Sequence, residues 1–236
     1  MVTIDFDRLN IKPGARVLDM GCGPGRHTAA VYRLKDVTIV GADLDLPDLL
    51  KARDRMMFHQ FVGAYDGGSW ALTVSDITNM PFKDRYFDVV ICSEVLEHIP
   101  DDKKALSELV RVVKPGGDLV VSVPRYVPEK ICWMLSDEYN QVNQGHIRIY
   151  RQPDVEKMLD DAGVTLWDTH FAHGIHTPYW WLRCLTGPTR EDVTAVHLYK
   201  RFLDWDTIKQ PKLSRTIDTL LNPLIGKSVV FYTRKE

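Results

Sequence analysis

The sequence contains no long apolar run and no excess of charge of either sign. No apolar run approaches the ~20 residues that a helix needs to cross a bilayer, so we expect no stable membrane insertion. A net charge of −2 argues against a protein that binds nucleic acid by neutralising its phosphates. The N-terminal residues lack the basic segment and apolar core of a signal peptide, and we expect a cytoplasmic location.

Cysteine is scarce and scattered, since the four cysteines form no C-x-x-C pair. We expect reduced thiols rather than disulfides or a zinc site, with Cys22 and Cys92 in buried strands. The remaining composition is ordinary for a globular protein, with 44% hydrophobic and 26% charged residues. A chain of 236 residues is long enough for one α/β domain with a sizeable core.

One glycine-rich stretch organises the N-terminal part of the chain. A short apolar run ends at Asp19, and Gly21, Gly23 and Gly25 follow at alternate positions before a helical pattern begins. This spacing is neither the G-x-G-x-x-G dinucleotide motif nor a P-loop, which would carry a lysine. Glycine lets the backbone approach a ligand closely, because no Cβ is in the way. The stretch therefore predicts a buried strand, a ligand-binding loop and a helix.

Acidic residues end the next two predicted strands, at residues 38–45 and 70–76. Asp43 follows the glycine loop by about 20 residues, where nucleoside-binding α/β folds place a carboxylate on the ribose hydroxyls. Asp45 could instead cap the following helix. Asp76 ends the third strand. Because parallel strands end at the same edge of a sheet, these acids and the glycine loop indicate a nucleoside site at that edge.

Two later segments carry a family resemblance. Residues 86–99 read YFDVVICSEVLEHI, and residues 114–117 read KPGG before an apolar strand. Together with the glycine loop they resemble the class I methyltransferases that use S-adenosylmethionine (SAM), in particular the small-molecule methyltransferases. The resemblance covers roughly residues 10–125 and, more weakly, 145–170 and 228–236.

Alternating strand and helix patterns predict an α/β fold with a doubly wound, mostly parallel sheet. The resemblance implies a Rossmann-like sheet of seven strands, the last antiparallel and inserted between the fifth and sixth. We expect a single domain over residues 1–236, with insertions at about 125–150 and 172–226 that form a helical lid. The second insertion should hold two helices. Residues 185–225 could alternatively be structural or form a homodimer interface.

The resemblance implies SAM as the cofactor and S-adenosylhomocysteine as its product. The methionine part would lie on the glycine loop, the ribose on Asp43, and the adenine on Asp76 and the Ile77 backbone. The full set of predicted cofactor residues is Asp19, Gly21, Cys22, Gly23, Gly25, Asp43, Leu44, Asp76, Ile77 and Ser93.

Methyl transfer from a sulfonium is an in-line displacement, in which alignment alone can supply ~7–11 kcal/mol. A hydroxyl acceptor also requires a base or a metal to remove its proton. His98 is the first candidate for the base, although it could merely cap Glu97 or pack under the lid. His146 and Tyr150 are the next candidates. In ubiquinone-pathway O-methyltransferases and small-RNA 2′-O-methyltransferases, a segment similar to Glu94, Glu97 and His98 binds a divalent cation, but we expect no metal here.

Aromatic and histidine side chains of the two insertions suggest an apolar or flat small-molecule acceptor, such as a lipid, quinone, polyketide or terpenoid precursor. The predicted acceptor-binding residues are Tyr126, Trp133, His173, His176, Tyr179 and Trp180. One alternative is a metal-assisted RNA 2′-O-methyltransferase, and another is a SAM-binding partner protein without catalysis. A third is a peripheral membrane enzyme with residues 209–224 on lipid, although we expect Leu220, Leu221 and Leu224 to pack in the core instead.

Overall fold

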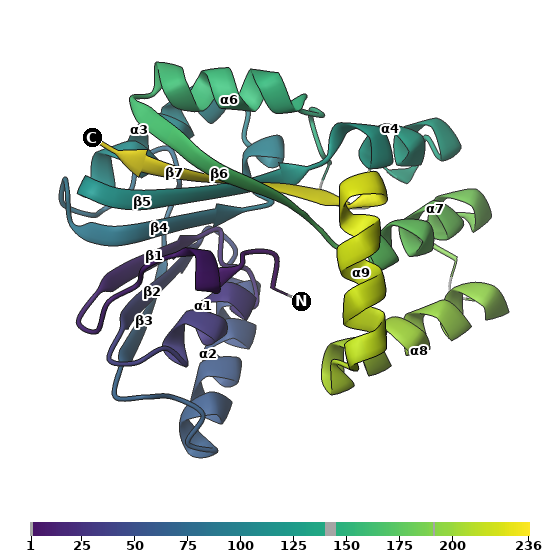
Figure 1. The fold of residues 1–236 in the computed structure, drawn as a ribbon, viewed down its shortest axis with the longest axis horizontal. Helices are drawn as coiled ribbons and strands as arrows, with labels where there is room; N and C mark the ends of the chain where they lie inside the picture. Colours follow the sequence, from purple (N-terminus) through teal and green to yellow (C-terminus); the bar gives the residue numbers. More distant parts are fainter. Residues whose placement is uncertain (1, 140–144, 191) are drawn as a thin grey trace.

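A computed structural model describes residues 2–139, 145–190 and 192–236 (Figure 1). Its centre is a seven-stranded sheet with the order β3-β2-β1-β4-β5-β7-β6. The strands are β1 (Arg16–Met20), β2 (Thr38–Asp43), β3 (Ser69–Val74), β4 (Phe87–Ser93), β5 (Val113–Pro124), β6 (Val164–Ala172) and β7 (Ser228–Lys235). β7 is antiparallel to both β5 and β6, and the other neighbouring strands are parallel. The predicted α/β fold is confirmed, including the antiparallel strand inserted between the fifth and sixth.

Helices cover both faces of the sheet and extend beyond one end of it (Figure 1). They are α1 (Arg26–Tyr32), α2 (Leu46–Phe61), α3 (Asp102–Val112), α4 (Tyr126–Leu135), α6 (Gln152–Asp161), α7 (Thr177–Thr186), α8 (Thr194–Lys209) and α9 (Lys212–Ile225). Three short 3₁₀ turns are η1 (Phe6–Arg8), η2 (Leu96–His98) and η3 (Gly174–His176). Among the described residues, no helix combines the length and the apolar character needed to span a bilayer.

The alternation of side chains along the strands builds two cores. Val17 packs with Tyr32 of α1 and Met56 of α2, whereas Leu18 packs with Leu106 of α3 and Leu159 of α6. Successive residues of a strand point to opposite faces, so each strand contributes to both cores. The central strands β1, β4 and β5 are thereby buried on both sides, as expected for parallel strands covered by helices.

The chain reverses its direction of winding at β1, which pairs with β2 on one side and β4 on the other. In open parallel sheets, ligands bind beyond the carboxyl ends of the strands at this switch point. Here the carboxyl ends of β1 and β4 are Met20 and Ser93, and the glycine loop follows Met20 directly. The fold therefore places the glycine loop where such a sheet binds its ligand.

Three local predictions require correction. The insertion 172–226 holds three α-helices instead of two, because Pro211 cannot continue the ladder of α8 and becomes the N-cap of α9. Cys22 lies in the glycine loop and not in a strand, although it is buried. Residues 114–117 do not separate a helix from a strand, since β5 already begins at Val113.

A third cluster lies outside the sheet, between α4 and α7. Cys132, Tyr139 and Cys184 are buried there, with the indole rings of Trp133 and Trp180 packed against them. All four cysteines of the chain are free and buried, which agrees with the expectation of reduced thiols. The predicted lid insertions thus have an apolar core of their own.

Candidate active site

A cavity of about 350 Å³ opens at the carboxyl ends of β1, β2 and β4. Eight of the ten predicted cofactor residues line it, namely Gly21, Cys22, Gly23, Asp43, Leu44, Asp76, Ile77 and Ser93. Asp19 and Gly25 lie behind this lining. The volume is within the range of about 300–1,000 Å³ that is usual for small-molecule and cofactor sites. Residues that are distant in the sequence thus meet around one space.

The glycine loop requires its glycines for different reasons. Gly21 has φ +73°, and a Cβ there would lie 2.3 Å from Cγ2 of Val95. Gly25 has φ +76°, and its Cβ would lie 2.9 Å from Cβ of Ala52. Gly23 also has positive φ, but a Cβ there would approach only Oδ2 of Asp48, at 3.7 Å. Gly21 and Gly25 thus allow close packing, and Gly23 keeps the cavity wall free of a side chain.

Asp43 holds the loop against the end of β2. Its Oδ2 accepts a hydrogen bond from the Gly23 backbone N–H at 2.7 Å, and its Oδ1 accepts one from the Asp45 N–H at 2.9 Å. Each carboxylate oxygen keeps a second acceptor position, which a ribose hydroxyl could use. Asp45 acts as the helix cap that the sequence left open. Its Oδ1 accepts a hydrogen bond from the Asp48 N–H at 2.9 Å and caps α2.

Asp19 supports the loop from behind. It is buried, and the Thr28 hydroxyl donates to its Oδ2 at 2.6 Å. Burial raises the pKa of Asp19 to about 6, although the hydrogen bonds from Thr28 act in the opposite direction. The residue therefore acts through the loop and α1 rather than on a ligand directly.

The adenine side of the cavity contains one exposed acid and one buried apolar residue. Oδ1 of Asp76 accepts from both the N–H and the hydroxyl of Thr78, each at 2.8 Å, and these bonds lower the pKa of Asp76. The Ile77 side chain packs into the core beside Met80. Asp76 is thus ionised and ready to accept, and the buried side chain of Ile77 fixes the position of its backbone.

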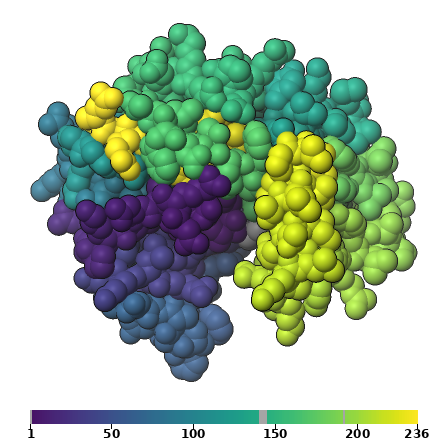
Figure 2. All heavy atoms as spheres, viewed as in Figure 1, coloured from purple at the N-terminus to yellow at the C-terminus, as the bar shows by residue number. Residues whose placement is uncertain are grey.

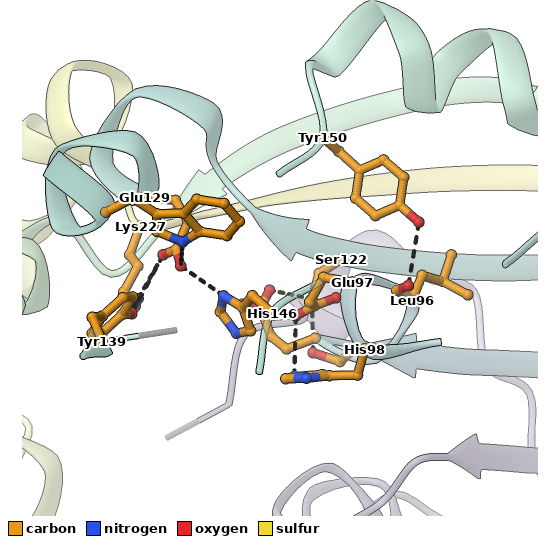
Figure 3. Close-up of polar contacts among 12 residues, drawn as sticks. Leu96, Glu97, His98, Ser122, Glu129, Tyr139, His146, Tyr150 and Lys227 are labelled. Carbon is orange, nitrogen blue, oxygen red and sulfur yellow. Dashed lines mark hydrogen bonds and ion pairs between the residues drawn. The ribbon is translucent and has the colours of Figure 1, made fainter. Parts of the chain in front are cut away.

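Two imidazoles meet at the wall formed by β4 and η2 (Figure 3). His98 lines the cavity, and its ring centroid lies 4.7 Å from that of His146. Nδ1 of His146 lies 2.6 Å from Oε1 of Glu129, and Nζ of Lys227 lies 3.3 Å from Oε2 of the same carboxylate. Burial alone would raise the pKa of Glu129, but His146 and Lys227 outweigh it and hold the pKa at about 2. His146 is therefore oriented by an ionised carboxylate.

Two further carboxylates lie in this region, Glu97 buried and Glu94 half-buried. Oε1 of Glu94 accepts from the Ser122 hydroxyl at 2.9 Å. Neither oxygen of Glu97 has a hydrogen-bond partner among the described residues, and Oε1 lies 4.0 Å from Nε2 of His98. Burial raises the pKa of both carboxyls. Ligand atoms of Glu97, His98 and His146 lie within 4.8 Å of one another, so His146 replaces Glu94 in the ligand set considered from the sequence.

Tyr150 does not join this group and is corrected as a catalytic candidate. Its hydroxyl lies 2.5 Å from Oδ2 of Asp102 and accepts from Nη1 of Arg148 at 3.2 Å. Its ring lines a groove between α3 and α6, away from His98 and His146 (Figure 3). Burial raises the pKa of Tyr150, so this hydroxyl fixes the chain between His146 and α6 instead of exchanging protons.

The predicted acceptor residues form separate groups, and none lines the cavity of the glycine loop. Nε1 of Trp133 donates to Glu129 at 3.3 Å, and Nζ of Lys227 lies 4.9 Å from the Trp180 ring centroid. These two indoles therefore lie next to the imidazoles. Tyr126 has different partners, since its ring contacts the Arg151 guanidinium at 5.0 Å.

His173, His176 and Tyr179 form the remaining group, at η3 and the start of α7. Nε2 of His173 lies 3.1 Å from the Thr3 hydroxyl, and its ring lies 5.7 Å from that of His176. Burial lowers the pKa of His176 to about 4. Tyr179 stacks on Tyr199 of α8 at 6.0 Å. This group joins the lid to the N-terminal segment.

Glu129, Lys227 and Tyr139 were missed by sequence reasoning. Tyr139 completes their network, since Nζ of Lys227 donates to its hydroxyl at 3.2 Å. Glu129 and Lys227 are 98 residues apart in the chain, and no local spacing connects them. The sequence signal was weak, since Glu129 is followed by a second charged residue, Lys130, in the same helix.

Comparisons with known proteins agree with this geometry. Residues 18–121 match the family described as "Methyltransferase domain". The ubiquinone/menaquinone biosynthesis C-methyltransferase UbiE of Vibrio campbellii is 36% identical over 118 residues, which cover 49% of this chain and 44% of UbiE. The cycloartenol-C-24-methyltransferase 1 of Oryza sativa subsp. japonica is 27% identical over 187 residues, which cover 73% of this chain and 50% of that protein. The chain thus spans half or less of the length of these relatives.

A solved structure of a SAM-dependent methyltransferase from Methanosarcina mazei has a similar fold. It superposes with a TM-score of 0.63 at 13% sequence identity, over 100% of this chain and 99% of that one. This likeness extends the match from the glycine loop and sheet to the whole fold. With its glycine loop, its acids at the strand ends and this sheet order, the chain belongs to the class I SAM-dependent methyltransferases.

Proposed function

We propose that this chain transfers a methyl group from SAM to a small apolar acceptor molecule. The observation that carries the proposal is the meeting of a cofactor cavity with two imidazoles at one wall, His98 within the lining and His146 behind it. The cavity would bind the methyl donor, and the imidazoles would remove a proton from the acceptor. Free cysteines throughout the chain are in keeping with a cytoplasmic enzyme.

The residues of the cavity fit SAM. Gly23 leaves the backbone bare for the methionine part, Asp43 retains acceptor positions for ribose, and ionised Asp76 can accept from the adenine amino group. When bound, SAM supplies an activated methyl group on a sulfonium. The chain itself aligns the acceptor and excludes water, and alignment can contribute ~7–11 kcal/mol.

His98 and His146 are placed to take a proton from the acceptor. Nδ1 of His146 faces the Glu129 carboxylate, so that its proton stays there and Nε2 remains the basic atom. His98 lies between this ring and the cavity. A positioned base typically contributes about 10²–10⁴-fold to such a step.

The aromatic cluster of the lid suggests the class of acceptor. Half-buried Trp133 and Trp180 pack beside the polar network, backed by buried Tyr139, and would present flat apolar surfaces to an acceptor that reaches the imidazoles. The names of the two relatives point the same way, since one acts in ubiquinone and menaquinone biosynthesis and the other on cycloartenol. We therefore infer an acceptor with a large apolar body, such as a quinone or terpenoid.

A second candidate is metal-assisted transfer to a hydroxyl, including an RNA 2′-hydroxyl. Among the described residues, the network contains three carboxylates, buried Glu97 and Glu129 and half-buried Glu94, and one ammonium, that of Lys227. Protons or a cation must balance the remaining charge in this low-dielectric setting. Glu97, His98 and His146 could hold a divalent cation, which would polarise the acceptor oxygen.

Calorimetric titration with SAM and with S-adenosylhomocysteine tests the cofactor half of the proposal. We expect micromolar binding of both by the intact chain and a loss of at least tenfold in Asp43→Ala. Asp101→Ala is the matched control, because Asp101 caps α3 at its Lys104 N–H and lies outside the cavity. Absence of binding by the unchanged protein would overturn the proposal. Transfer to a panel of quinones and terpenoids, with and without a chelator, then separates the two candidates.

A further inference from the structure

Helix α9 has its polar residues turned inward. Asp218 accepts from the Ile175 N–H at 3.0 Å, and Asn222 accepts from the Gly174 N–H at 2.7 Å. Arg215 forms an ion pair with buried Asp206 of α8. These polar contacts attach α9 to η3 and α8, and Leu221 packs beside Gly174 on the same inner side.

The outer face of α9 is apolar. Leu213, Ile217, Leu220 and Leu224 follow one another at intervals of four, three and four residues, which places them on one side of the helix. Their exposed fractions are 74%, 42%, 68% and 72%. The expectation that Leu220 and Leu224 pack in the core is therefore wrong. None of the four lines the cofactor cavity, and Figure 2 shows α9 standing at the molecular surface.

An ordinary surface helix has the opposite arrangement, with its apolar stripe toward the core. A row of exposed aliphatic side chains on a well-anchored helix marks a surface that another body covers. Helix α8 adds to it, with Trp205 and Ile208 exposed by 48% and 77% near the turn that leads into α9. Tryptophan is enriched at membrane–water interfaces, because its ring is apolar and its N–H is polar.

The charge of this helical pair indicates what covers it. Residues 194–225 contain five lysines and arginines and three aspartates, although the whole chain carries a net charge of −2. Two of those aspartates face inward, where Asp206 pairs with Arg215 and Asp218 accepts from the Ile175 N–H. The exposed charged residues of the pair are Lys200, Arg201, Asp204, Lys209 and Lys212. Four of these five are cationic, and Lys209 and Lys212 flank the turn between the helices.

We propose that α8 and α9 dock on the surface of an anionic phospholipid bilayer. The aliphatic row of α9 lies at the boundary between headgroups and acyl chains, and the lysines of the turn contact anionic headgroups. A second copy of the chain fits less well. A two-fold interface would bring each cationic surface against its own copy. The proposal goes beyond methyl transfer and holds whatever the acceptor is.

Vesicle co-sedimentation of the intact protein tests this docking. Vesicles of phosphatidylcholine mixed with phosphatidylglycerol should bind the protein, whereas pure phosphatidylcholine vesicles should bind it weakly. Removing one cation costs about 1 kcal/mol near such a surface, so Lys209→Ala and Lys212→Ala should each weaken binding about fivefold. The double substitution Leu220→Asp/Leu224→Asp should abolish binding to the vesicles, because it places two carboxylates in the apolar row.

Phe58→Asp/Phe61→Asp is the matched control, because these α2 side chains are also exposed, by 62% and 89%. It should bind vesicles as the unchanged protein does. Urea unfolding of each variant verifies the fold. Since neither this control nor the vesicle assay contains SAM, a failure of docking is distinguishable from a failure of the proposed function. Docking is overturned if the unchanged protein ignores anionic vesicles or if Leu220→Asp/Leu224→Asp still binds them. It is also overturned if the protein is a dimer without lipid and these substitutions make it a monomer.

Discussion

Nδ1 of His146 lies 2.6 Å from Oε1 of Glu129, in a site where the carboxylate is buried and also bound by Lys227. This pair determines which ring nitrogen carries the proton and in which direction the other points. Both residues belong to the first insertion, with Glu129 on α4, whereas Lys227 stands immediately before β7. The chemistry at the cavity wall therefore depends on residues outside the family motifs.

Replacing Glu129 by Gln should lower kcat by about 10²-fold, because the imidazole of His146 loses the carboxylate that orients it. The affinity for SAM should stay within twofold, since Glu129 lies outside the cofactor cavity. Single-turnover methyl transfer and calorimetry measure the two quantities. Tyr139→Phe, which removes only the hydroxyl 3.4 Å from Oε2 of Glu129, serves as the control. An unchanged kcat in Glu129→Gln would show that the pair is only structural.

Replacing Gly21 by Ala should destabilise the fold by about 3 kcal/mol. Positive φ costs an L-residue about 1–2 kcal/mol, and the new Cβ would collide with Val95 at 2.3 Å, adding about 1–3 kcal/mol of overpacking. Gly14→Ala isolates the first cost, because Gly14 has φ +83° and no atom within 4 Å of its Cβ position. Urea unfolding of both variants, and of Gly21→Ala/Val95→Ala, measures the difference. If Gly14→Ala and Gly21→Ala lowered the free energy of unfolding equally, the predicted collision with Val95 would be wrong.

Addition of Zn²⁺ should raise the melting temperature of the purified protein. The buried carboxylate of Glu97 has no hydrogen-bond donor among the described residues, and two imidazoles converge on it. Binding should weaken as pH falls, since the imidazoles and the carboxyl must lose their protons to ligate. Thermal unfolding with Zn²⁺ or a chelator tests this, with Glu97→Gln losing the shift and Glu94→Gln keeping most of it. If Zn²⁺ raised the melting temperature of Glu97→Gln as much as that of the unchanged protein, the ion would bind at another site.

Stability should fall as pH drops from about 6.5 toward 3, in part because of His27. Its Nε2 accepts from the Thr3 N–H at 3.0 Å, and burial, aided by Arg26, lowers its pKa to about 3. Between these pH values the unfolded chain binds a proton at this histidine and the folded chain does not, so the folded state loses about 2 kcal/mol by pH 5. Urea unfolding at pH 8 and pH 5 should show a smaller decrease for His27→Gln. An identical decrease would exclude His27 as the cause.

The residues that line the cavity could be predicted from the sequence, whereas the polar network around His146 could be predicted only in part. Asp43, Asp76 and the glycines end consecutive elements of one parallel sheet, and the sheet fixes where such ends meet. His98 belongs to η2, the first turn after β4, so its position near the same sheet edge could also be predicted. Glu129 and Lys227 meet because the Arg125 N–H at the start of α4 donates to the Lys227 carbonyl at 2.7 Å, a contact that no short-range pattern records. Tyr150 was misplaced for the same reason, because its hydroxyl bonds to Asp102 across 48 residues.

The position of β7 between β5 and β6 has a consequence for the order of folding. β6 gains its neighbour only when Ser228–Lys235 docks, and that pairing closes a loop of more than a hundred residues from β5. Lys227 stands immediately before this strand, so Glu129 acquires its ammonium partner in the same event. The network that orients His146 is thus completed by the last strand along the chain. A folding intermediate with the earlier strands in place could hold the cofactor before it could catalyse transfer.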